Sequence, residues 1–110
     1  MVEMVKIVVF VPLTHTEIVR KAMGDAGAGH IGNYSHCSFS SKGTGRFLPQ
    51  EGAKPNIGAV GKSEEVAEER IETICPRSIA KNVIAVIKKV HPYEEVALDV
   101  FPLINEESLI

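Results

Sequence analysis

In the first stretch of the chain, β-branched residues occupy every second position from Val5 to Val11, with Lys6, Val8 and Phe10 between them, and Pro12 interrupts the run. A period of two is the pattern of a β-strand, because successive side chains point to opposite faces. Proline cannot donate to a sheet ladder, so Pro12 predicts the end of the strand. Both faces of the run are largely apolar, which indicates a strand in the middle of a sheet.

The period changes to that of a helix immediately afterwards. The apolar residues recur at spacings of three and four: Ile18, Val19, Ala22, Met23 and Ala26. The preceding Thr-His-Thr-Glu of residues 14–17 predicts a capping box, in which the threonine and glutamate side chains satisfy the first amides of the helix. Gly27 and Gly29 then stand where the end of a helix requires a positive φ.

The second half of the chain repeats the two patterns. Alternation predicts a strand over 34–41 and another over 71–75, which ends at Pro76. Between them lies a long glycine-rich and proline-rich segment, 42–69, of the kind that is often functional in a small domain. Apolar spacing predicts a second helix over 78–90, ended by the sequence His91-Pro92. A last strand is expected over 95–101.

The resulting order is strand, helix, strand, strand, helix, strand. With right-handed crossovers, this order predicts an α+β, ferredoxin-like split β-α-β fold with an antiparallel sheet of strand order 4-1-3-2. Both helices then cover one face of the sheet. Since a bare apolar sheet face would aggregate, the other face favours a homo-oligomer.

Composition narrows the class of protein. The 110 residues are predicted to form one domain, 1–110, and the net charge of −2 gives no basis for binding nucleic acid or an anionic membrane. No apolar run is long enough to span a bilayer, and no secretory signal is recognisable. Two cysteines are too few for a disulfide framework. We therefore expect a cytoplasmic protein with reduced thiols.

Residues 27–32 match the G-x-G-x-x-G pattern of dinucleotide-binding turns. That pattern works between a strand and the start of a helix, whereas here it follows a helix and precedes a strand. We interpret it as the end of a helix and a tight turn. Gly61-Lys62-Ser63 is not a phosphate loop either, because Asn56 stands where the motif requires glycine.

Two clusters could bind a metal ion. His36 and Cys37 are adjacent, but alternation would put them on opposite faces of a strand, which favours Cys37 as a core residue. Residues 91–95, His-Pro-Tyr-Glu-Glu, offer imidazole, phenol and carboxylate groups for a cation or for acid–base chemistry. The alternative is structural, namely a protonated His91 stabilised by the negative end of a helix.

Four stretches together resemble a known domain: GAGHIGNYSHCSFS, GTGRFLP, KPNIGAVGK and HPYEEVALDVFPL. They resemble a stand-alone version of the PII/CutA-like domain inserted in NGG-interacting-factor-three-like proteins, the GTP cyclohydrolase type 2 homologue family. The resemblance covers about residues 5–103. It implies a PII-like and CutA-like fold that forms homotrimers, with a long loop between the second and third strands. The dinuclear metal site of that family lies in its flanking domains, so neither its ligands nor any hydrolase chemistry is carried over.

Two functions are therefore open. The first is a small non-catalytic oligomer that binds a protein partner or a small ligand through the motif loops. The second is a divalent-cation-binding protein or a metal-dependent hydrolase-associated domain that uses the region of His36, His91, Glu94 and Glu95. No catalytic residue is predicted and no cofactor is required, although a divalent cation fits the second function. The weak metal candidates are His36, His91 and Glu95. The candidate ligand or interface residues are Gly29, Gly32, Asn33, Tyr34, His36, Gly43, Gly45, His91, Tyr93, Glu94 and Glu95.

Overall fold

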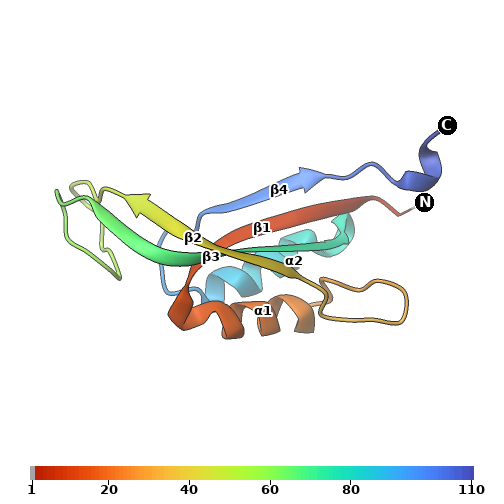
Figure 1. Ribbon diagram of the computed structural model, residues 1–110, viewed down its shortest axis with the longest axis horizontal. Helices are drawn as coiled ribbons and strands as arrows, with labels where there is room; N and C mark the ends of the chain where they lie inside the picture. Colours follow the sequence, from red (N-terminus) through yellow and green to blue (C-terminus); the bar gives the residue numbers. More distant parts are fainter. Residues whose placement is uncertain (1) are drawn as a thin grey trace.

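The computed structural model describes residues 2–110, which form one four-stranded sheet and two α-helices (Figure 1). The elements in chain order are β1 (Met4–Pro12), η1 (Leu13–His15), α1 (Thr16–Asp25), β2 (Phe39–Phe47), β3 (Glu64–Pro76), α2 (Arg77–Val90), β4 (Leu98–Pro102) and η2 (Glu106–Ser108). The sheet order is β2-β3-β1-β4, and every neighbouring pair is antiparallel. The predicted α+β, ferredoxin-like fold is confirmed.

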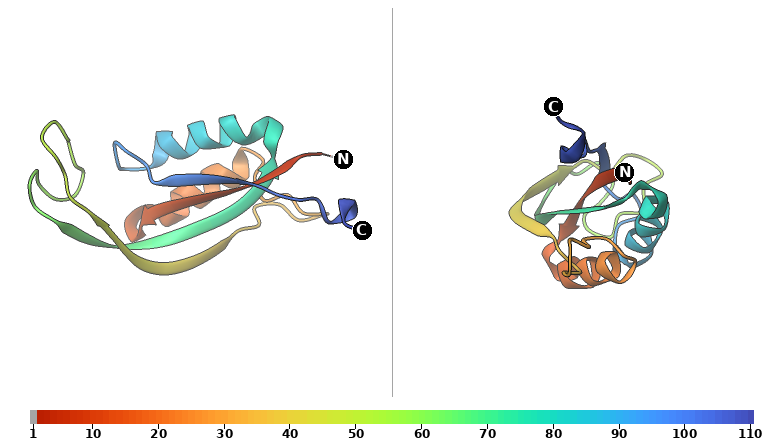
Figure 2. Two further views of the ribbon diagram at one scale, coloured as in Figure 1. Left: turned by 90° about the horizontal axis from the view of Figure 1, so that it is seen from above. Right: turned by 90° about the vertical axis from the view of Figure 1, so that its right-hand side faces the viewer.

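Both helices pack on the same face of the sheet (Figure 2). The core between the two layers takes alternate residues of β1, which point toward the helices. It consists of Val5, Ile7, Val9, Val11, Val19, Met23, Ala28, Ile71, Cys75, Ala80, Val83 and Ile87. The opposite face of the sheet carries no helix (Figure 2). On that face the large aromatic side chains of Phe39 and Phe101 remain 67% and 45% exposed.

The start of α1 differs from the prediction. A 3-10 turn, η1, precedes the helix, so His15 rather than Thr14 occupies the N-cap position, and no side chain caps the helix. The hydroxyl of Thr14 instead lies 2.8 Å from Nδ1 of His15. The capping-box prediction was wrong because the extra turn moves the first helical amide out of reach of Thr14.

The end of α1 agrees with the sequence analysis. The amide of Gly27 donates to the carbonyl of Gly24, and the amide of Ala28 donates to that of Met23. These two bonds form a Schellman motif, which requires a positive φ at its glycine, and φ of Gly27 is 105°. The G-x-G-x-x-G pattern is therefore the end of a helix.

Strand β2 begins later than predicted and extends further. Residues 34–38 are not a strand, because Ile31 and Tyr34 close a short turn and His36 has φ of 60°. In contrast, Gly43 and Gly45, which the sequence suggested lie in a loop, belong to β2 and pair with Glu68 and Val66 of β3. β3 also begins earlier than expected, at Glu64. The long connection is consequently limited to residues 48–63.

Candidate functional site: a cavity between the β2–β3 ribbon and the α2–β4 turn

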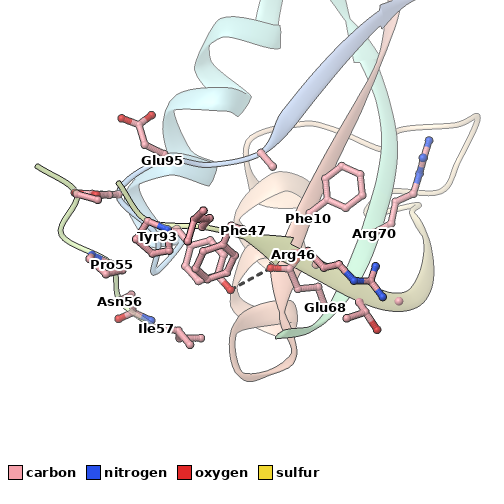
Figure 3. Close-up of a pocket in the computed structure, with 18 of the residues that line it drawn as sticks. Phe10, Arg46, Phe47, Pro55, Asn56, Ile57, Glu68, Arg70, Tyr93 and Glu95 are labelled. Carbon is pink, nitrogen blue, oxygen red and sulfur yellow. Dashed lines mark hydrogen bonds between the residues drawn. The ribbon is translucent and has the colours of Figure 1, made fainter. Parts of the chain in front are cut away.

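A cavity of about 710 Å³ lies where the β2–β3 ribbon meets the turn that follows α2 (Figure 3). Its walls come from β2, the segment 48–63, Phe10 of β1, Glu68 and Arg70 of β3, and residues from the stretch 93–97. Three aromatic rings contribute to the lining: those of Phe10, Phe47 and Tyr93. Basic and acidic side chains share the lining: Lys42, Arg46, Arg70, Glu68, Glu94 and Glu95.

Tyr93 and Glu68 form the polar centre of one wall (Figure 3). The phenol hydroxyl of Tyr93 donates to Oε2 of Glu68 over 3.0 Å, and Glu68 is buried. Burial is the main cause that raises the pKa of Tyr93 well above its ordinary range, and the hydrogen bond to this carboxylate is the second. The phenol therefore acts as a fixed hydrogen-bond donor rather than as an acid or base near neutral pH.

Gly45 makes room for this pair. A Cβ at position 45 would collide with the carboxylate of Glu68, so a side chain there would displace it. Glycine within a strand often marks such a close approach of another group. This is the physical reason why a glycine that suggested a loop lies in β2.

His91 supports the same wall from behind. Its Nε2 lies 2.8 Å from the carbonyl oxygen of Phe10, and its Nδ1 accepts from the amide of Tyr93 over 3.1 Å. These partners fit a neutral imidazole with the proton on Nε2. Burial lowers the pKa of His91, although the bond to Phe10 and the charge of Glu68 oppose that shift. Because Nδ1 accepts a hydrogen bond from the Tyr93 amide, the geometry does not favour the protonated His91 that the helix end suggested.

The segment 48–63 is tied to the turn after α2. The amide of Lys54 donates to Oε1 of Glu94 over 2.7 Å. The ring of Tyr93 also meets Phe47 edge to face, with centroids 5.9 Å apart. These contacts close one side of the cavity with residues that are far apart in the sequence.

The predicted site residues separate into two groups. Gly43, Gly45, Tyr93, Glu94 and Glu95 line the cavity, and His91 packs against Tyr93. The remaining candidates belong to the segment 26–38, at the other end of the molecule (Figure 1). They are Gly29, Gly32, Asn33, Tyr34 and His36.

Within the second group, Gly29 is a structural residue, since its missing side chain leaves room for the backbone of Cys37. Gly32, Asn33 and Tyr34 form the tip of the turn, and Tyr34 is 74% exposed. His36 binds Asp25 and not the groups around His91.

The combination of His36, His91, Glu94 and Glu95 is therefore not one metal centre. His36 lies at the far end of the molecule, and both ring nitrogens of His91 already have partners in the protein. Across residues 2–110, no three His, Cys, Asp or Glu side chains are grouped to hold a metal ion.

Sequence reasoning missed Glu68, Phe47 and Lys54 as residues of the site. Glu68 had no signal in the sequence, because residues 64–70, EEVAEER, do not alternate between apolar and polar positions. The contact between Lys54 and Glu94 has no signal in the sequence.

Known proteins are similar to this chain in sequence and in fold. No protein-family profile matches the chain. A relative from Halalkalibacterium halodurans, a GTP cyclohydrolase 1 type 2 homolog, is 58% identical over 101 residues, which are 92% of this chain and 27% of the relative. The chain is a homologue of one segment of the GTP cyclohydrolase 1 type 2 homologs. It spans about a quarter of their length, and the predicted resemblance to this family is confirmed.

Solved structures give the same result. A Bacillus cereus protein related to NIF3 superposes with a TM-score of 0.83 at 62% identity, over 94% of this chain and 26% of that chain. The periplasmic divalent cation tolerance protein CutA of Archaeoglobus fulgidus superposes with a TM-score of 0.67 at 18% identity, covering 91% and 83% of the two chains. The GlnK–ATP complex of Bacillus subtilis gives 0.63 at 14%, with 92% and 82% covered. CutA and GlnK share the fold.

Proposed function

We propose that this domain binds a small ligand in the cavity beside Tyr93 and that the cavity performs no catalysis on it. The observation that carries the proposal is the cavity itself. Its volume of about 710 Å³ falls within the range of roughly 300–1,000 Å³ that ligand pockets occupy. An aromatic lining with a few fixed polar groups is also the usual composition of such pockets.

Hydrogen bonds within the protein hold two parts of the cavity wall in place. The Tyr93 hydroxyl is fixed on Glu68, and the segment 48–63 is tied to Glu94. A ligand would therefore displace water without ordering these groups, which reduces the entropic cost of binding. The lining carries three basic and three acidic side chains, so it suits a ligand that combines a flat apolar part with both hydrogen-bond donors and acceptors.

We propose further that the domain acts as a homo-oligomer, with a trimer as the expected state. The exposed aromatic side chains of Phe39 and Phe101 on the face without helices support an interface there. The free thiols of Cys37 and Cys75 support a cytoplasmic location.

A thermal-shift and calorimetric screen tests the ligand proposal, with adenine nucleotides and divalent cations in the panel. A ligand at a hundred times its dissociation constant stabilises the native state by about 2.7 kcal/mol. Both classes are included because GlnK forms a complex with ATP and CutA is a divalent cation tolerance protein. A nucleotide response would support the cavity, whereas a response to cations alone would favour the cation-binding alternative.

The variant Gly43→Val shows whether binding uses the cavity. A Cβ at Gly43 meets no atom within 4 Å, so valine would enter the empty space without a clash. Valine also suits a strand. We expect the variant to fold and to lose binding, while Ser40→Val on the same strand keeps it, because Ser40 does not line the cavity. Equal binding by both variants would place the ligand elsewhere.

A further inference from the structure

The side chains of Ser35, His36 and Asp25 form a hydrogen-bonded chain at the end of α1, far from the cavity. Nδ1 of His36 lies 2.9 Å from the hydroxyl of Ser35. On the other side of the ring, Nε2 of His36 lies 2.9 Å from Oδ1 of Asp25. A hydroxyl, an imidazole and a carboxylate in this order are the parts of a nucleophile with its base and the group that orients the base.

Two features that are unfavourable for the local backbone, at positions 24 and 36, hold the imidazole of His36 in this position. Within residues 2–110, His36 is the only residue other than glycine that has a positive φ, and its value is 60°. Gly24 occupies the last turn of α1, where a glycine costs about 1 kcal/mol relative to alanine. A Cβ at Gly24 would fall within the ring of His36, so the glycine is what admits the imidazole. Strain of this kind is often found at functional sites.

Asp25 determines which nitrogen of His36 carries the proton. Hydrogen bonds from Lys21 and then from His36 lower the pKa of Asp25, so the carboxylate is ionised and only accepts. The ammonium of Lys21 lies 2.6 Å from Oδ2, which leaves Oδ1 for the imidazole. Nε2 must then donate to Asp25, and the lone pair of Nδ1 faces the hydroxyl of Ser35.

We propose that Ser35, His36 and Asp25 form an acyl-transfer site, in which His36 is the general base for the Ser35 hydroxyl and Asp25 positions the imidazole. The serine oxygen forms a bond to the acyl carbon, and its proton moves to Nδ1 of His36. The bond from the acyl carbon to the alcohol oxygen then breaks, and the alcohol leaves with that proton. Water attacks the acyl-serine with His36 again as the base and releases the acid.

The surroundings define the class of substrate. The hollow beside His36, Cys37 and Ser38 has a volume of only about 10 Å³, which is too small for an acyl chain. Ser35 is exposed, and the side chains of His36 and Asp25 are 48% and 51% exposed. The site therefore suits small esters with a good leaving group that reach it directly from solvent.

The experiment uses p-nitrophenyl acetate and the full chain with Cys37→Ala, because the half-buried thiol of Cys37 would compete for the ester. We expect an acetyl group on Ser35 by mass spectrometry, together with release of p-nitrophenol. Ser35→Ala should abolish the acetyl group at this position, whereas Ser38→Ala, a serine of the same segment, should not alter it. General-base catalysis typically contributes about 100-fold or more, so loss of His36 should slow acetylation by about that factor.

Two variants separate chemistry from structure. Glycine accepts a positive φ, so His36→Gly should keep the backbone, and added imidazole should restore acetylation of Ser35. Gly24→Ala should displace the ring and slow acetylation while α1 becomes no less stable. Absence of the acetyl group in the parent protein, acetylation that does not depend on His36, or failure of imidazole to restore it would overturn the proposal.

Discussion

The same residue type has opposite roles at the two ends of this molecule. His91 is buried, and both of its ring nitrogens are used within the protein by Phe10 and Tyr93. His36 is half-exposed and joins Asp25 to Ser35. Both were metal candidates in the sequence analysis, because imidazole is a common metal ligand. Only the partners of each ring separate a structural histidine from one that can accept a proton.

The buried state of His91 predicts a dependence of stability on pH. Its pKa in the folded protein is lower than its ordinary value of 6.5, so the unfolded chain binds the proton more readily. The contribution of His91 to the free energy of unfolding is complete above about pH 6.5 and is lost as the pH falls through the lowered folded pKa.

Urea unfolding at several pH values between about 7 and 5 measures this dependence. The variant His91→Gln retains the other titrating groups, so the difference between the two proteins isolates His91. We expect the advantage of the wild type over the variant to shrink as the pH falls. An advantage that stays constant, or that grows toward acid, would contradict the buried neutral imidazole.

At the scale of elements, the β2–β3 ribbon determines the shape of the site. The sequence predicted the existence and order of all four strands, because the alternation of side chains along a strand is a local signal. It did not predict the length of β2, since Gly43 and Gly45 are typical of turns. The contact between Gly45 and Glu68 explains the difference, and this contact depends on the pairing of two strands.

A pair of glycine variants in β2 tests that explanation. Gly45→Ala should displace the carboxylate of Glu68 and break its bond to Tyr93, which costs roughly 1–3 kcal/mol of unfolding free energy. Gly43→Ala, two residues away in open space, should be neutral or should stabilise the protein by about 0.5 kcal/mol. Denaturant unfolding of the two variants measures the difference, and equal effects would show that Gly45 has no special role.

At the scale of the whole molecule, the sheet is covered on one side only. The layer of helices buries the alternating apolar residues of β1, while Phe39 and Phe101 remain exposed on the other face. No helix within residues 2–110 is long and apolar enough to cross a membrane. An interface with further copies of the chain is the simplest way to bury this face.

Light scattering after size exclusion tests the assembly. For a chain of 11.9 kDa, the proposed trimer has about three times that mass at micromolar concentration. Phe39→Lys would place a charge in the interface and should shift the mass toward that of the monomer. Ile18→Lys is the matched control, because Ile18 is a comparably exposed apolar residue on α1. A monomeric wild type, or equal effects of the two variants, would count against an interface on this face.

The sequence by itself determined the order of the elements and the topology of the sheet. These follow from the periods of two and of 3.6 residues and from the handedness of crossovers, which act over short stretches. The tertiary structure alone decided the sites. Glu68 meets Tyr93, Lys54 meets Glu94 and Asp25 meets His36 across intervals that carry no periodic signal. Such contacts arise only when the sheet and helices have brought distant segments together, and both proposed sites depend on them.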